Sequence, residues 1–136
     1  MGAFIVKPVY LLDSVILIDH LRGLEMAAKW LGKLEEGVAV LSVITRAEVL
    51  SGGSCEEAHA ARELCDRFEC LPLTKDDATV AAELRRKNRW KLPDALQAAL
   101  ANNNRLRLVT RDVRGFDEKK HPFVLIPYRL RQAAKS

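Results

Sequence analysis

The sequence predicts an α/β fold in which a central parallel sheet is covered by helices on both faces. Short apolar runs typical of buried strands alternate along the chain with longer segments whose apolar residues recur at helical spacing. Residues that cap or terminate helices stand at several of the boundaries between these segments. Such repeated alternation brings successive parallel strands into one sheet through right-handed crossovers.

Five short segments have the composition of strands. They are residues 9–12, 38–41, 70–73, 106–110 and 123–126. The third is the weakest of them, because Pro72 cannot donate a hydrogen bond to a neighbouring strand.

Six segments have a helical pattern. They are residues 16–21, 24–34, 42–50, 55–68, 75–87 and 94–101. Asp13 and Ser14 can cap the first helix, and Thr74 can cap the fifth. Gly23 closes the first helix, and Pro93 is tolerated at the start of the sixth.

The composition fits a single globular domain, residues 1–136. With 136 residues, of which 49% are hydrophobic, the chain can bury a core without disulfides. No apolar run approaches the ~20 residues of a membrane-spanning helix, and no signal peptide is expected. The three cysteines lack the spacing of a zinc site, so we expect reduced thiols in a cytoplasmic protein that does not associate with membranes.

Positive charge is unevenly distributed. The net charge is +4, but residues 105–136 carry 9 basic and 3 acidic side chains, whereas residues 1–104 carry 13 and 15. A second group of cations surrounds Trp90. It consists of Arg85, Arg86, Lys87, Arg89 and Lys91. This pattern favours binding of a polyanion, with the indole ring stacking on a base; a solvated helix end followed by a loop remains the alternative.

Four acidic residues stand just after predicted strands or within the helices that follow them. Asp13 and Asp112 each come after a predicted strand, Glu48 lies in the helix after the second strand, and Asp94 begins the sixth helix. Ligand sites in open parallel sheets form at the carboxyl ends of the strands, so these four side chains are expected at one edge. Taken singly, each has an ordinary explanation as a helix cap, a solvent-facing acid or an ion-pair partner.

Four carboxylates in one cleft repel each other by about 4 kcal/mol for each close pair, taking ~4 Å and an effective dielectric of ~20. Divalent cations with oxygen ligands, such as Mg²⁺ or Mn²⁺, relieve this repulsion. A carboxylate-held ion can also activate water for attack on a phosphodiester. The residues therefore predict a metal-dependent nuclease.

Four segments of the chain resemble PIN domains, and most closely the VapC-type toxins of toxin–antitoxin pairs. These are residues 11–14, 42–52, 92–99 and 108–116. The resemblance covers nearly the whole chain. It implies a three-layer α/β/α fold and a Mg²⁺- or Mn²⁺-dependent endoribonuclease that cleaves structured RNA. It also implies a homodimer that a cognate antitoxin neutralises.

By motif match, Asp13, Glu48 and Asp94 resemble the three principal acids of the family. Asp112 resembles the fourth, with Thr110 at the family's hydroxyl position beside it. Ser14 follows the first acid and can still donate a hydrogen bond.

Two positions depart from the family pattern. Val15 stands where many relatives have a polar residue, and Gly115 stands where relatives often have an acid. Asp117 therefore rivals Asp112 as the fourth acid. The departures leave a non-catalytic PIN-like binding module as an alternative. A nuclease of RNA maturation without an antitoxin is another. A phosphate-ester regulator of the CheY-like fold would need a lysine after a late strand, which the sequence lacks there.

Several further residues are given an expected role. Arg111 and Arg114 are candidates for holding phosphates. Asp19, six residues after the first acid, should face away from it into solvent. Trp30 lies in an apolar helical stripe and is expected in the core or at a dimer contact; an exposed apolar patch of Trp30, Leu31 and Leu34 would suit the dimer. The three histidines share no motif, so no catalytic role is expected for them.

Overall fold

The computed structural model describes residues 6–130 and contains the predicted parallel sheet. Its strand order is β3-β2-β1-β4-β5, and every neighbouring pair is parallel. The strands are β1 Tyr10–Leu12, β2 Ala39–Ser42, β3 Glu69–Leu71, β4 Arg107–Val109 and β5 Val124–Leu125. The chain leaves β1 first toward β2 and later returns to β4 on its other side, which makes the carboxyl ends of β1 and β4 the switch point of the sheet.

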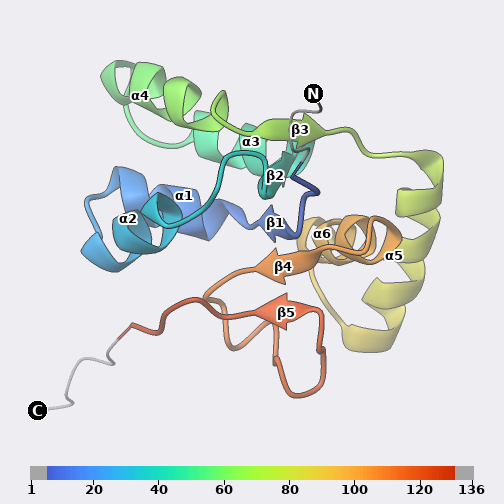
Figure 1. The fold of residues 1–136 in the computed structure, drawn as a ribbon. Coiled ribbons are helices and arrows are strands. Elements are labelled where there is room, and N and C mark those ends of the chain that lie inside the picture. Colours follow the sequence, from blue (N-terminus) through green and yellow to red (C-terminus); the bar gives the residue numbers. More distant parts are fainter. Residues whose placement is uncertain (1–5, 131–136) are drawn as a thin grey trace, which may run out of the picture.

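Within residues 6–130, six helices cover the sheet. They are α1 Ser14–Leu21, α2 Glu25–Gly32, α3 Val43–Ser51, α4 Cys55–Cys65, α5 Lys75–Asn88 and α6 Leu92–Asn103. Figure 1 shows α5 and α6 together on one side, and α1 to α4 on the other. The predicted three-layer α/β/α fold is confirmed.

Side chains alternate between the two faces of the central strands. Leu11, Val40 and Leu108 pack toward α5 and α6. Their successors along the strands pack toward α1 to α4. These are Leu12, Leu41 and Val109. Because helices cover both faces, the strands are apolar throughout, as parallel strands usually are.

Side-chain caps stand at the predicted starts of α3 and α5. Ser42 accepts a hydrogen bond from the Thr45 amide at 3.0 Å and begins α3. Thr74 and Asp77 form a reciprocal capping box at the start of α5. Several boundaries differ from prediction. Strand β3 ends before Pro72, α4 ends at Cys65 instead of residue 68, and α6 runs from Leu92 to Asn103 because the asparagines complete its last turn.

Of the two places expected for Trp30, the structure shows the core, and the exposed apolar patch suggested for a dimer contact is wrong. Leu31 is only 7% exposed, and Trp30 and Leu34 are half-buried. The Trp30 ring packs edge-on against Tyr10, with 5.6 Å between the ring centroids. The stripe therefore belongs to the core between α2 and the sheet.

The cysteine prediction is confirmed, since all three have free thiols. Among the described residues, no helix has both the length and the apolar character needed to cross a bilayer.

Candidate active site

The four acidic residues line one cleft at the carboxyl edge of the sheet. Asp13 stands between β1 and α1, Glu48 on α3, Asp94 in the first turn of α6, and Asp112 just after β4. The cleft has a volume of about 670 Å³. The predicted convergence of side chains from four distant parts of the chain is therefore observed.

Asp13 is fixed on both carboxylate oxygens. Oδ1 accepts a hydrogen bond from the Ser14 amide at 2.8 Å, and Oδ2 accepts one from the Thr110 hydroxyl at 2.7 Å. Thr110 directly follows β4, which pairs with β1, so the sheet register brings this hydroxyl to the acid. The side chain of Asp13 is thus held in one orientation toward the cleft.

A buried polar layer lies beneath the acids and joins three of their elements. The Thr45 hydroxyl of α3 donates to the Leu12 carbonyl of β1 at 3.1 Å, and Gln97 Nε2 of α6 donates to that hydroxyl at 2.5 Å. Each of these side chains lies three residues from an acid on the same helix, Thr45 from Glu48 and Gln97 from Asp94. Because these hydrogen bonds hold α3 and α6 in place beside β1, they also fix the positions from which Glu48 and Asp94 extend. Gln97 was not predicted from the sequence, although its spacing from Asp94 was an available signal.

Burial, and to a smaller extent the charges of neighbouring acids, raises the pKa values of three acids in the cleft. Burial raises the pKa of Asp13, with a smaller contribution from the negative charge of Asp112. Burial also raises the pKa values of Glu48 and Asp94, and the charge of Asp13 adds to both. The ionised cleft is therefore less favourable in the folded protein than the same groups are in water, and a cation would relieve this cost.

The oxygen donors fit a hydrated divalent ion. Among residues 6–130, no three or more His, Cys, Asp or Glu side chains stand close enough together to hold an ion directly. Mg²⁺ usually takes only one or two carboxylates and keeps several waters, and Mn²⁺ accepts the same ligands. The cleft therefore suits an ion held partly through water.

The structure distinguishes the two rivals for the fourth acid. Asp112 lines the cleft, and its Oδ1 accepts hydrogen bonds from the Arg114 and Gly115 amides at 3.2 and 3.1 Å. Asp117 is not among the residues that line the cleft, and its Oδ1 caps the following turn through the Lys119 amide. The geometry favours Asp112.

The expectation that Asp19 faces solvent is wrong. Its exposed fraction is 5%. Arg111 binds the carboxylate with two hydrogen bonds, of which the Nη2–Oδ1 bond is 2.8 Å, and the Tyr128 hydroxyl donates to Oδ2 at 2.7 Å. The loop after β4 and the segment after β5 both cover this end of α1. The Arg111 guanidinium is therefore paired with Asp19, and its predicted contact with phosphate stays a prediction.

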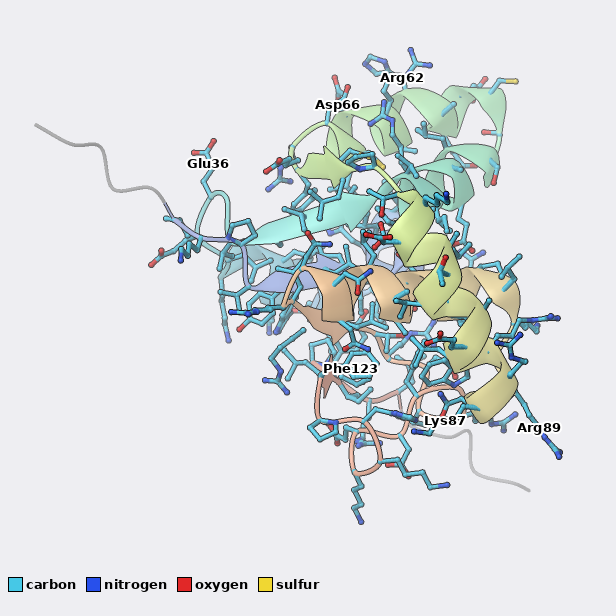
Figure 2. The ribbon with its side chains drawn as sticks, turned by 90° about the vertical axis from the view of Figure 1, so that its right-hand side faces the viewer. Glu36, Arg62, Asp66, Lys87, Arg89 and Phe123 are labelled. Carbon is cyan, nitrogen blue, oxygen red and sulfur yellow. The ribbon has the colours of Figure 1, made fainter. Side chains whose placement is uncertain are left out.

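The predicted basic group lies on the surface at the junction of α5 and α6. All five of its cations are exposed: Arg85, Arg86, Lys87, Arg89 and Lys91. Figure 2 shows Lys87 and Arg89 extending outward from the end of α5. Lys91 is the member nearest the acids, since its charge acts to lower the pKa of Asp94. Three of the arginines line a separate pocket of about 350 Å³ beside Trp90.

Trp90 itself is only 8% exposed. Its ring packs against Phe116 and His121, with centroid distances of 5.0 and 4.9 Å. The predicted stacking of this indole on a base is therefore wrong, because the ring is buried among side chains of the protein.

Two further residues at the cleft come from the C-terminal segment. Arg129 and Leu130 line it, and Arg129 also pairs with Glu118 at 2.7 Å. The sequence analysis missed both, and no motif in this part of the chain could have indicated them.

Comparisons with known proteins agree with this geometry. The model of the PIN domain matches residues 10–122. The ribonuclease VapC10 of Mycobacterium tuberculosis is 34% identical, over 89% of this chain and 98% of that protein.

Solved structures have the same fold. A toxin–antitoxin complex from Klebsiella pneumoniae has a chain that aligns with a TM-score of 0.80 and 31% identity, over 89% of this chain and 99% of that one. VapBC2 from Rickettsia felis, bound to a DNA fragment from its promoter, aligns with a TM-score of 0.71 and 18% identity, over 90% and 99% of the two chains. The chain belongs to the PIN-domain family.

Proposed function

We propose that this protein is a divalent-metal-dependent endoribonuclease and the toxin of a toxin–antitoxin pair. The observation that carries the proposal is the cleft that four carboxylates from distant elements line. The similarity to a VapC ribonuclease and to toxin–antitoxin complexes supports both the activity and the pairing.

The acids have separable roles in this proposal. Asp13, Glu48, Asp94 and Asp112 hold the ion, either directly or through water. A bound Mg²⁺ or Mn²⁺ supplies positive charge that activates water and stabilises the displaced oxygen of the phosphodiester. Thr110 and the Ser14 amide keep Asp13 in place, and their hydrogen bonds leave further lone pairs of its carboxylate free for the ion. Glu48, with a raised pKa, is suited to accept a proton from the attacking water.

The basic group at the α5–α6 junction would bind the RNA backbone. Its residues are Arg85, Arg86, Lys87, Arg89 and Lys91, and Lys91 is the nearest to the acids. Arg114 and Arg129 would add phosphate contacts at the rim of the cleft. Phosphate contacts of this kind make binding strongly dependent on salt.

The partners in this proposal are an RNA substrate, a cognate antitoxin protein and a second copy of the chain. The solved neighbours include toxin–antitoxin complexes, which supports the antitoxin. The homodimer and the cytoplasmic location rest on the family resemblance.

The test is cleavage of a structured RNA by the purified protein with Mn²⁺ and with a chelator. We expect cleavage only with the metal, and a decrease of at least about a hundredfold in Asp13→Asn, because ligand loss exceeds the 10–100-fold cost of removing a supporting contact. Asp76→Asn, an exposed acid on α5 outside the cleft, is the matched control and should keep full activity. Equal cleavage by Asp13→Asn and the control would contradict the proposal.

One observation favours a second candidate, a non-catalytic binding module. The described acidic side chains do not form a closely spaced set of three. In that case the RNA would bind in a salt-dependent manner through the basic group, but Mn²⁺ would not produce cleavage. The same assay, with RNA retention on a filter as a second readout, separates the two.

A further inference from the structure

The buried indole of Trp90 connects the basic group to the loop that carries the fourth acid. Trp90 follows Arg89 and lies just before α6. Its Nε1–H donates a hydrogen bond to the Gly115 carbonyl at 2.7 Å. Its ring also contacts Phe116 and His121. One side chain thus ties the α5–α6 junction to residues 115–121.

The loop that Trp90 holds is a tight turn built around the Asp112 side chain. The Phe116 amide donates to the Asp112 carbonyl at 3.0 Å and closes the turn. Asp112 Oδ1 accepts the amides of Arg114 and Gly115. Gly115 is therefore held on both sides, by Trp90 at its carbonyl and by Asp112 at its amide.

Hydrogen bonds continue from this turn to the first acid. The Asp112 amide donates to the Thr110 hydroxyl oxygen at 3.1 Å, and that hydroxyl donates to Asp13 Oδ2 at 2.7 Å. The connected series runs Trp90, Gly115, Asp112, Thr110, Asp13. It crosses from the surface that carries the cations to the floor of the cleft.

Gly115 is also the residue that gives the Asp112 carboxylate its position. A Cβ at Gly115 would lie 2.6 Å from Asp112 Oδ2 and 3.3 Å from its Cγ. The carboxylate therefore occupies the space that a side chain at this position would fill. Any residue other than glycine would move the acid.

We propose that Trp90 is a positioning residue for Asp112: it holds the 112–116 turn, through Gly115, so that the Asp112 carboxylate faces the cleft. The structural part of this inference stands without the nuclease activity, and only its kinetic consequence rests on the proposed function.

The first test uses the metal-free protein. Trp90→Phe keeps a ring but removes the N–H donor, and it should speed hydrogen exchange of the Gly115 and Phe116 amides by about tenfold. Trp30→Phe, the same replacement in the core beside Tyr10, is the matched control and should leave both amides unchanged. Unchanged exchange in Trp90→Phe would overturn the inference, whatever the activity of the protein.

The second test is kinetic. We expect Trp90→Phe to lower kcat by about tenfold while KM changes less than about twofold, since the lost bond supports an acid and not the RNA. Gly115→Ala, which displaces the Asp112 carboxylate directly, should likewise lower kcat while KM changes little.

A double-mutant cycle completes this test. In an Asp112→Ala background, Trp90→Phe should reduce kcat no further. Additive losses, or an effect confined to KM, would overturn the inference by showing that Trp90 acts independently of Asp112. A wild-type protein that cleaves no RNA but shows the exchange effect would refute the proposed function and leave the positioning role intact.

Discussion

Asp13 and Asp19 lie at opposite ends of α1, and the fold treats their charges in opposite ways. Asp19 is 5% exposed and meets a guanidinium and a phenol. Burial acts to raise the pKa of Asp19, but the hydrogen bonds from Arg111 and Tyr128 outweigh it, and the pKa is lowered. Asp13 is also enclosed, but it has other carboxylates as neighbours, and burial together with the charge of Asp112 raises its pKa.

The charge of Asp19 is neutralised by a cation of the protein itself, whereas the charge of the acidic cleft would be neutralised by a bound ion. Arg111 lines the acidic cleft, but its guanidinium donates its hydrogen bonds to Asp19, near the other end of α1 from Asp13. The Asp19 cluster therefore contributes to stability, whereas the cleft retains an unbalanced negative charge. That imbalance is what a divalent ion would neutralise.

Asp19→Asn should have the largest effect on stability. It leaves Arg111 partly buried without its counter-charge, and such a loss costs about 3 kcal/mol. Denaturant unfolding measures this difference. Asp66→Asn, which removes the surface ion pair with Arg46, is the control and should cost less than about 1 kcal/mol. Equal losses in both variants would show that the Asp19 cluster does not differ from a surface pair.

Tyr128→Phe should have an intermediate effect. It removes one hydrogen bond to a charged, buried acceptor, for which about 1.5 kcal/mol is expected. Tyr10→Phe is the control in the same unfolding measurement, because it makes the same change at a tyrosine of β1 outside this cluster. If Tyr128→Phe unfolds like wild type, the segment after β5 is not anchored through Asp19.

Glu48→Gln should act in the opposite direction. Because the raised pKa of Glu48 shows that its charge is unfavourable in the folded state, the neutral amide should raise the melting temperature of the metal-free protein by a few degrees. Glu83→Gln on α5 is the matched control. A lower melting temperature in Glu48→Gln would show that the charge of Glu48 does not destabilise the folded protein.

The pH dependence should be the smallest effect. Asp13, Glu48 and Asp94 have raised pKa values, so above about pH 4 the folded state binds more protons than the unfolded state, and stability falls as the pH rises. The pKa of Asp19 is lowered, so its effect on stability has the opposite sign: the stability that this residue contributes is lost as the pH falls through its pKa. Melting curves with a chelator, from pH 4 to 7, should show a shallower decline in Glu48→Gln than in wild type.

The fold and the acidic edge followed from local pattern. Strand segments and helix caps can be recognised within a few residues. Asp13, Asp94 and Asp112 each stand at such a boundary, and Glu48 lies inside α3. The parallel topology then brings those boundaries to one edge. These features could be predicted because they need no knowledge of which distant side chains meet.

The errors concern side chains whose surroundings come from far along the chain. Asp19 meets Arg111 and Tyr128, which lie 92 and 109 residues later. Trp90 stands among cations in sequence, but its indole bonds to a carbonyl 25 residues away. Helical angle and local charge say nothing about such contacts, so both residues were expected on the surface.

Calorimetric titration of Mn²⁺ into the metal-free protein tests the central claim most directly. We predict that wild type binds Mn²⁺ and that Asp94→Asn binds it at least about tenfold more weakly. Asp76→Asn should match wild type. If Asp94→Asn retains the wild-type affinity, or if wild type binds no Mn²⁺ at millimolar concentration, the cleft is not a metal site.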